Sequence, residues 1–303
     1  MSREPHSPSP SDATVPGALP SRGSPDRLSP DLLLERLRGL TRELGSAIVC
    51  YSGGIDSALV LAVSHEQLAH AALGLTAVSP SLAPSEREDA GRLAASIGAR
   101  HEFVDSHEID RPEYVANGPD RCFHCKSELY DIARRRRDEL GFAHILNGTN
   151  ADDLGDYRPG LEAARLAGIR SPLVELGFDK ADVRAVAQLL GLPIWNKPAA
   201  ACLSSRIPYG TAVTRERLSQ IAGFEQDLRD LGFSQARVRW HGKIARIELA
   251  VAELPRALEP ERRQRLVAAG KRHGFNYVTL DLEGYRVGSH NEVLPGHALR
   301  VIQ

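Results

Sequence analysis

Apolar residues in the first two thirds of the chain fall into short runs that alternate with segments of helical spacing. Four of these runs predict buried strands, at residues 47–51, 73–78, 101–104 and 144–146. Helices are predicted at residues 31–44, 58–69, 84–97, 129–140 and 179–190. Strands that alternate with helices of this length form a parallel sheet with helices on both faces. We therefore predict an α/β domain over residues 29–210.

The pattern changes after about residue 210. A long helix at 214–231 comes before two strands of alternating polarity, at 236–240 and 244–249. A second helix at 260–272 and a last strand at 277–282 follow. We interpret residues 211–303 as a smaller α+β domain that completes a substrate site or assembles a homo-oligomer.

The N-terminal segment differs from both domains in composition. Residues 1–30 contain seven of the nineteen prolines and seven serines, with almost no large apolar residues. Such a segment cannot bury enough surface to offset the entropy of ordering it. We expect a disordered tail over residues 1–28, with order beginning at the helix-start signal Ser29-Pro30-Asp31.

Charge and composition exclude several classes of protein. The 38 basic and 39 acidic residues give a net charge of −1, which argues against a nucleic-acid binder that relies on a basic surface. No apolar run approaches the roughly eighteen residues needed to cross a bilayer, and no signal-peptide core is present. Four cysteines in 303 residues do not make a disulfide scaffold. The sequence thus predicts a cytoplasmic protein that binds neither a membrane nor nucleic acid.

The strongest local signal is the hexapeptide SGGIDS at residues 52–57, between a predicted strand and a predicted helix. Its two glycines allow the backbone to approach a ligand closely, and the following helix directs its N-terminal N–H groups to the same place. Ligands of open α/β sheets bind at this edge, at the carboxyl ends of the strands. The residues predicted to bind phosphate are Ser52, Gly53, Gly54, Asp56 and Ser57.

Three cysteines are candidates for metal or sulfur chemistry. Cys122 and Cys125 form a CxxC pair, and Cys202 lies about eighty residues later. Three accessible cysteines suit a [4Fe–4S] cluster with one iron left open. A redox pair with one separate thiol is the alternative, whereas no second CxxC or HxxxH pair completes a structural zinc site. Cys50 lies inside an apolar strand, where a packing role is favoured.

Several charged residues are weaker candidates. Asp152 and Asp153 follow a predicted strand and are candidates for Mg²⁺ binding, with solvated loop acids as the alternative. Arg206, four residues after Cys202, is a candidate for clamping a substrate carboxylate or phosphate. Three further arginines alternate along two strands and bind either a substrate phosphate or opposite charges across the sheet: Arg237, Arg239 and Arg246.

The hexapeptide SGGIDS resembles the PP-loop of the N-type ATP pyrophosphatases, which include GMP, NAD and asparagine synthetases and tRNA thiolases. That resemblance implies an adenine nucleotide alpha hydrolase-like fold and cleavage of ATP to AMP and pyrophosphate. From about residue 31 onward the chain is identified as a member of the LarE family, the ATP-dependent sulfur transferases of nickel-pincer nucleotide cofactor synthesis. Six segments carry this resemblance together: SGGIDS, RCFHCKSELY, NGTNADDLGDYRPG, PAAACLSSRIPYG, VRWHGKIARIEL and NYVTLDLEGYRVGS.

The family resemblance implies a reaction and its cofactors. A carboxylate of a pyridinium dicarboxylate mononucleotide is adenylated with ATP and Mg²⁺, and sulfur then replaces an oxygen to give a thiocarboxylate. Cys202 matches the cysteine that delivers sulfur. In some members this cysteine is consumed and becomes dehydroalanine, whereas in others it binds a [4Fe–4S] cluster with two more cysteines. The presence of Cys122 and Cys125 matches the cluster-using branch.

Three other functions remain open at this level. A tRNA thiolase can share both the PP-loop and a three-cysteine cluster. Sulfur can also come from sacrifice of Cys202 itself. A non-catalytic module that binds nucleotide or cluster is a rival from another class, although the intact SGGIDS hexapeptide argues against it.

Overall fold

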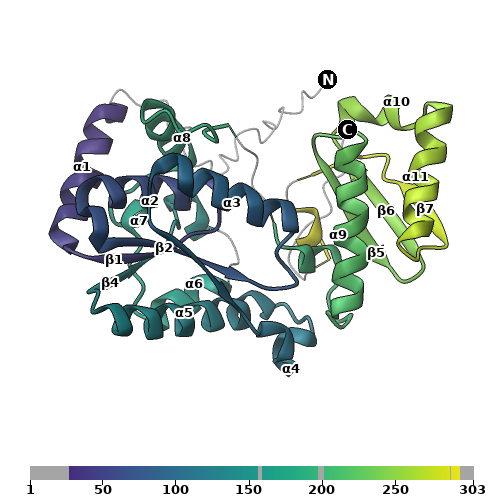
Figure 1. Ribbon diagram of the computed structural model, residues 1–303. Coiled ribbons are helices and arrows are strands. Elements are labelled where there is room, and N and C mark those ends of the chain that lie inside the picture. Colours follow the sequence, from purple (N-terminus) through teal and green to yellow (C-terminus); the bar gives the residue numbers. More distant parts are fainter. Residues whose placement is uncertain (1–26, 156–158, 197–200, 287, 294–303) are drawn as a thin grey trace, which may run out of the picture.

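The protein is described by a computed structural model that covers residues 27–155, 159–196, 201–286 and 288–293. A four-stranded parallel sheet forms the larger lobe (Figure 1), in the order β3-β2-β1-β4. Its strands are β1 (Ala47–Cys50), β2 (Ala72–Val78), β3 (His101–Asp105) and β4 (His144–Leu146). The parallel α/β class and the four predicted strands are therefore confirmed. Most of the predicted tail, residues 1–26, lies outside the described residues.

Helices cover both faces of this sheet (Figure 1). Alternate residues of β1 point into two different cores, with Val49 facing one layer of helices and Ile48 facing the other. The first layer contains α1 (Pro30–Leu44), α2 (Ile55–Leu68), α3 (Pro84–Ile97), α7 (Pro172–Glu175) and α8 (Lys180–Leu189). The second layer contains α5 (Arg121–Leu140) and α6 (Pro159–Leu166), with the short α4 (Pro112–Val115) beside them.

Two helix starts differ from the sequence prediction, and both changes affect the site. Helix α5 begins at Arg121 rather than near residue 129, so Cys122 and Cys125 lie in its first turns and not in a loop before it. The early turns were missed because they are mostly polar and because Asp120 provides no side-chain cap. Helix α2 begins at Ile55, directly after Gly54. Part of the SGGIDS segment therefore belongs to the first helical turn.

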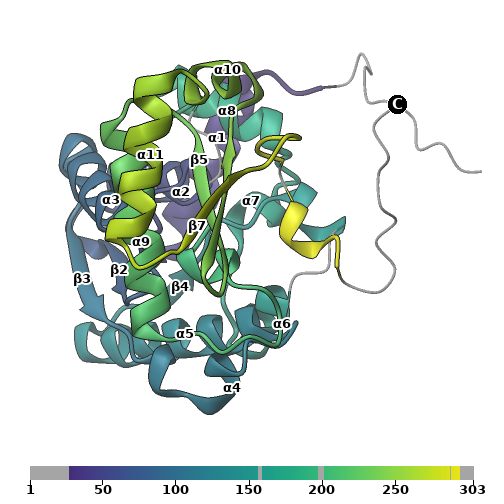
Figure 2. The ribbon, with the colours of Figure 1, turned by 90° about the vertical axis from the view of Figure 1, so that its right-hand side faces the viewer.

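The C-terminal lobe contains a mixed sheet in the order β5-β6-β7, with β5 antiparallel and β7 parallel to β6 (Figure 2). Its strands are β5 (Ala236–His241), β6 (Ile244–Leu249) and β7 (Tyr277–Leu280). Its helices are α9 (Arg215–Asp230), α10 (Leu254–Ala257) and α11 (Pro260–Arg272). The core of this lobe also contains Tyr114, Leu203 and Ile207, which come before the predicted boundary at residue 210. The position of that boundary stays a prediction.

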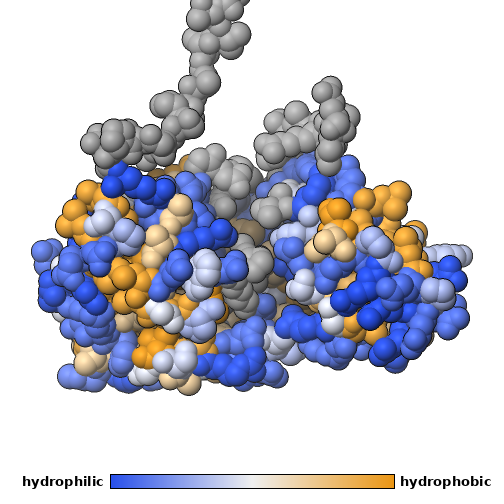
Figure 3. Space-filling view, turned by 90° about the horizontal axis from the view of Figure 1, so that it is seen from above, coloured by the Kyte–Doolittle hydropathy of each residue, from blue (hydrophilic) through white to orange (hydrophobic). Residues whose placement is uncertain are grey.

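Two observations concern the surface. Hydrophilic side chains dominate the face seen in Figure 3, with separate hydrophobic patches over each lobe. Among the described helices, none combines the length and the apolar character needed to span a bilayer.

The last two residues of the predicted tail, Arg27 and Leu28, make contacts with the α/β domain. Arg27 pairs with Asp179 and Asp182, and Leu28 packs on the core.

Candidate functional site

The SGGIDS segment forms a tight loop at the carboxyl end of β1. The Ser57 hydroxyl accepts from the Ser52 N–H at 3.1 Å and donates to the Gly54 carbonyl at 3.1 Å. Gly53 has a φ of 75°, and a Cβ there would lie 3.0 Å from the Cβ of Ala90 in α3. Only glycine meets both conditions without strain. The loop is therefore shaped by its own serines and by the approach of α3.

A second glycine brings the loop after β4 onto the PP-loop. A Cβ on Gly148 would lie 2.5 Å from the backbone nitrogen of Ser57, which is closer than atoms can approach. A hydrogen bond two residues later continues this contact, because Asn150 Nδ2 donates to Asp56 Oδ1 at 3.0 Å. The NGTN segment thus fixes the Asp56 carboxylate from the side.

The predicted magnesium ligands lie next to this contact. Asp152 Oδ2 accepts from the backbone N–H of Lys180 at 2.9 Å, and Asp153 Oδ2 accepts from that of Asn150 at 3.1 Å. The Lys180 ammonium lies 2.5 Å from Asp56 Oδ2. Mg²⁺ is commonly held by one or two carboxylates together with substrate phosphates. Asp56 becomes a further candidate because Lys180 contacts both Asp56 and Asp152, and Mg²⁺ binding by Asp152 and Asp153 stays a prediction.

The three candidate cysteines come together from two segments. Cys122 and Cys125 lie in α5, and Cys202 precedes the 3₁₀ helix Leu203–Arg206. Burial and then Cys202 raise the pKa of the Cys122 thiol, although Cys122 is exposed to solvent. Burial raises the pKa of Cys125 to about 12, with contributions from Glu108, Cys202 and Cys122. Each thiol therefore lies within electrostatic range of the others.

A [4Fe–4S] cluster at these three thiols stays a prediction. Within the described ranges, no three His, Cys, Asp or Glu side chains are grouped closely enough to hold one metal ion. Thiolates on different irons of one cluster stand further apart than thiolates on a single zinc. Two of the three thiols are exposed, and Arg121 partly offsets the burial and the Cys202 charge that raise the pKa of Cys122.

Lys126, one turn after Cys122, connects the cysteines with the PP-loop strand. Burial lowers the pKa of its ammonium, but interactions with Tyr130, Cys125 and Cys50 outweigh burial and raise it. Cys50 is the last residue of β1, and burial raises its pKa to about 12. Lys126 is therefore a positive charge within electrostatic range of the cysteines and of the end of β1, and the sequence analysis did not predict it.

Arg206 holds the backbone on which Cys202 lies. Its Nη1 donates to the carbonyl of Ala201 at 3.0 Å and to that of Cys202 at 3.1 Å. Its other nitrogens pair with the Glu225 carboxylate of α9 at 2.8 and 3.2 Å. Arg206 is 3% exposed. These contacts position the cysteine loop, while a direct contact of Arg206 with substrate stays a prediction.

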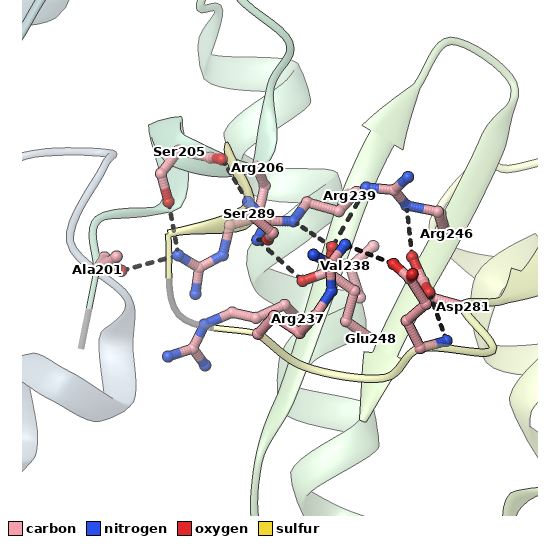
Figure 4. Close-up of polar contacts among 12 residues, drawn as sticks. Ala201, Ser205, Arg206, Arg237, Val238, Arg239, Arg246, Glu248, Asp281 and Ser289 are labelled. Carbon is pink, nitrogen blue, oxygen red and sulfur yellow. Dashed lines mark hydrogen bonds and ion pairs between the residues drawn. The ribbon is translucent and has the colours of Figure 1, made fainter. Parts of the chain in front are cut away.

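The three strand arginines share one face of the small sheet but differ in their partners (Figure 4). Arg239 is buried and forms two hydrogen bonds with Glu248, at 2.9 and 2.8 Å. Arg246 is more exposed and lies 3.2 Å from Glu248 and 3.4 Å from Asp281. Among the described residues, Arg237 has no carboxylate partner, and its guanidinium lies over the Tyr285 ring at 5.2 Å. Of the three, Arg237 is the one available to an anion.

A histidine close to these arginines was also missed from sequence. The His290 ring lies 4.3 Å from that of Tyr209, and its Nε2 is buried without a hydrogen-bond partner among the described residues. Burial and then Arg121, Arg239 and Arg206 lower the pKa of His290 to about 3. Burial and the charges of three arginines from different elements therefore keep this ring neutral.

The contacts of these additional site residues were not apparent from sequence patterns. Gly148 and Asn150 stand in the quoted segment NGTNADDLGDYRPG, so their motif was found although their contacts were not. Lys180 and His290 carry no local signal, because their partners are distant in the chain. Three quoted segments contain positions outside the described residues, namely 156–158, 198–200 and 287.

Comparison with known proteins adds independent information, although no family model matches the chain. An uncharacterised protein of Synechocystis sp. is 48% identical over 261 residues, which are 86% of this chain and 97% of that protein. The pyridinium-3,5-bisthiocarboxylic acid mononucleotide synthase of Lactiplantibacillus plantarum is 39% identical over 254 residues, 84% of this chain and 91% of that protein. The tRNA-specific 2-thiouridylase MnmA of Anaplasma marginale is 26% identical over 198 residues, about half of each chain (53% and 50%).

These similarities agree with the motifs. The distant likeness to a thiouridylase covers about half of each chain, and it supports the PP-loop assignment. The likeness to the mononucleotide synthase extends over most of both chains at 39% identity. The chain therefore belongs to the family of pyridinium-3,5-bisthiocarboxylic acid mononucleotide synthases, the LarE family.

Proposed function

We propose that this protein is an ATP-dependent sulfur transferase of nickel-pincer nucleotide cofactor synthesis. It adenylates a carboxylate of a pyridinium dicarboxylate mononucleotide and converts that carboxylate to a thiocarboxylate. The observation that supports the proposal is the contact between the Cys122 and Cys202 segments, where Arg121 Nη1 donates to the Ser204 carbonyl at 2.9 Å. The relative that shares most of the chain is named for a bisthiocarboxylic acid product, which such chemistry would form.

The first step takes place at the PP-loop. The substrate carboxylate oxygen attacks the α-phosphorus of ATP, an acyl adenylate forms and pyrophosphate leaves. The backbone N–H groups of residues 53 and 54 and the start of α2 receive the pyrophosphate. Asp56 and Asp152 would hold Mg²⁺, which neutralises phosphate charge as the bond to pyrophosphate breaks.

The second step replaces AMP by sulfur. A sulfur nucleophile attacks the acyl carbon, the bond to the AMP oxygen breaks and the thiocarboxylate forms. Cys122, Cys125 and Cys202 would hold a [4Fe–4S] cluster, which supplies a sulfide when it is bound. Arg206 keeps the Cys202 backbone in place through the two carbonyl contacts described above. Lys126 adds a positive charge within electrostatic range of the cysteines.

The substrate phosphate is assigned to the arginine face of the small sheet. Arg237 is the candidate ligand because its guanidinium lacks a carboxylate partner in the described chain. Arg239 and Arg246 surround the same position but are paired with Glu248, so they support the positive field more than they bind directly. Assembly of several copies through the C-terminal lobe stays a prediction.

The tRNA thiolase is the second candidate, favoured by the distant likeness to MnmA. That likeness covers about half of each chain, and the net charge of −1 counts against a protein that binds RNA mainly through its charge. Sacrifice of Cys202 is the alternative source of sulfur. It leaves Cys122 and Cys125 without a role, which is why we prefer the cluster.

Alanine variants of the three cysteines test the proposal. Cys122→Ala, Cys125→Ala and Cys202→Ala should each lose iron, acid-labile sulfide and sulfur transfer but keep ATP-dependent pyrophosphate release. Cys50→Ala is the matched control, because this buried thiol lies outside the trio and should keep all four properties. The protein is purified without oxygen, and its intact mass is recorded before and after turnover.

The sacrificial alternative gives a different result. Active enzyme would then lose about 34 Da per turnover as cysteine becomes dehydroalanine, and only Cys202→Ala would be inactive. A mass loss at Cys202 together with an active Cys122→Ala variant would disprove the cluster proposal. Steeply salt-dependent binding of tRNA would instead support the thiolase.

A further inference from the structure

The carboxylate of Asp56 is held by two residues from distant parts of the chain. Lys180 Nζ lies 2.7 Å from its Oδ1 and 2.5 Å from its Oδ2, across 124 positions of sequence. Asn150 Nδ2 donates to Oδ1 at 3.0 Å, across 94 positions. The PP-loop carboxylate therefore has a bidentate cationic partner before any nucleotide is considered.

Lys180 itself is held in a fixed position. It is the first residue of α8, where Asp179 and Asp182 form a reciprocal cap of the helix start. Arg27 forms ion pairs with the carboxylates of Asp179 and Asp182, at 2.6 and 2.8 Å. The backbone N–H of Lys180 donates to Asp152 at 2.9 Å. Three contacts to neighbouring elements thus place the base of this side chain at the edge of the PP-loop.

The ion pair contributes little to stability. The side chains of Lys180 and Asp56 are 32% and 22% exposed, and pairs in contact with solvent are worth at most about 1 kcal/mol. Such a pair can exchange partners at small cost. Its placement at the phosphate-binding loop, rather than its strength, is what needs an explanation.

The charges of the loop supply that explanation. The segment Ser52 to Ser57 contains no lysine or arginine and carries one acidic residue, Asp56. A triphosphate that approaches it therefore meets a carboxylate of the same sign. The nearest cation that the structure joins to that carboxylate is the Lys180 ammonium, which is flexible enough beyond its fixed base to turn toward a phosphate.

We propose that Lys180 is a phosphate ligand of the ATP site and that its pair with Asp56 is the nucleotide-free arrangement of that ligand. This inference rests on the proposed function. When Mg²⁺–ATP binds, the metal takes over Asp56 and the released ammonium pairs with a phosphate oxygen. Metal and nucleotide binding are thereby coupled through one exchange of partners.

Calorimetric titration with ATP, with and without Mg²⁺ and without acceptor substrate, tests this exchange. Lys180→Met should weaken Mg²⁺–ATP binding by about 10- to 100-fold, the effect of one lost charge-assisted hydrogen bond. Lys180→Arg should retain most of the affinity. Lys271→Met, an exposed lysine in the last turn of α11, is the matched control and should bind as the wild type does.

Asp56→Asn gives the more distinctive result. It removes the carboxylate that competes with phosphate for Lys180, so ATP without Mg²⁺ should bind more tightly than to the wild type. Addition of Mg²⁺ should then strengthen binding far less. The same substitution in a Lys180→Met background should give a much smaller gain, whereas loss of like-charge repulsion alone would strengthen binding equally in both backgrounds.

Three results overturn the inference. If Lys180→Met binds Mg²⁺–ATP within about twofold of the wild type, the role of Lys180 is overturned. The proposed function survives this result, because the protein still binds ATP. If Lys180→Met does not fold, unchanged Mg²⁺-free affinity of Asp56→Asn overturns the role of Lys180 in the same way. A wild-type protein that binds no ATP overturns both the inference and the proposed function.

Discussion

Two parts of the site are built in different ways. In the phosphate-binding loop, the hydrogen bonds run between Ser52, Gly54 and Ser57, which lie within six residues of one another. In the cysteine and arginine region, Arg206 joins the loop of Cys202 to α9, and Arg239 joins β5 to Ser205 at 2.7 Å. The hydrogen bonds of the phosphate-binding loop thus stay within one short segment, whereas the cysteine and arginine region is assembled from segments of both lobes.

This difference separates binding from positioning. The backbone N–H groups of the PP-loop are consecutive in the chain, and the Lys180 ligand proposed above is the part of this site that depends on α8. The cysteine and arginine region requires that α5, the Cys202 loop and the small sheet are all correctly placed against one another. Damage to the loop should therefore abolish one chemical step, whereas damage to the second region should affect stability, substrate affinity and pH response separately.

The largest effect is expected at the closest contact of the PP-loop. Gly148→Ala places a methyl group 2.5 Å from the nitrogen of Ser57, so the loop must move. A displacement of about 1 Å can cost 100-fold, and we expect pyrophosphate release to fall by at least about that factor. A coupled phosphate assay measures the loss.

Gly39→Ala is the control for this variant. Gly39 lies in α1, and a methyl group added there would meet no neighbouring atom within 4 Å, so activity should be unchanged. Full activity of a folded Gly148→Ala protein would contradict the role given to this contact.

The next effect is a loss of stability in the arginine region. Arg239→Met leaves the Glu248 carboxylate, only 2% exposed, without its bidentate partner. Breaking a buried pair in this way should lower the free energy of unfolding by about 3 kcal/mol, as measured in urea. Arg246→Met, at a side chain 42% exposed, should lower it by at most about 1 kcal/mol. Equal losses in the two variants would show that burial of the pair is not what matters.

Arg237→Met should act on substrate and not on stability. Its guanidinium stacks on Tyr285 without an ion pair in the described chain, so unfolding should change by about 1 kcal/mol or less. Loss of a phosphate contact should raise KM for the mononucleotide by about 10- to 100-fold with little change in kcat. A fall in kcat at constant KM would place this arginine at the reacting atoms instead.

The smallest effect is a pH dependence carried by His290. Its pKa falls to about 3 in the folded protein, from an ordinary value near 6.5 in the unfolded chain. Between these values the unfolded chain binds more protons, so this residue makes stability decrease as the pH falls below about 6.5. His290→Gln should therefore lose less stability than the wild type between pH 7 and pH 5 in parallel urea titrations. Identical slopes for both proteins would exclude the burial of a neutral His290.

Phosphate binding and a role for the three cysteines stay predictions, but the sequence by itself determined the parallel sheet, the SGGIDS turn and the CxxC pair. Each depends on residues that are close in the chain: an apolar run ended by Gly53 and Gly54, or a CxxC pair. It also misplaced the start of α5, because the polar first turns of this helix gain their stability from tertiary packing rather than from a local cap.

Only the tertiary structure decided which charges meet. Arg206, Arg239 and Arg237 look alike in the sequence, yet the first two are paired with carboxylates and the third has no such partner among the residues that the structure describes. Lys180 has no motif around it and becomes the partner of Asp56 because α8 starts at the edge of the PP-loop. Coulomb interactions depend on distance in space, and a separation of 124 residues along the chain carries no information about that distance.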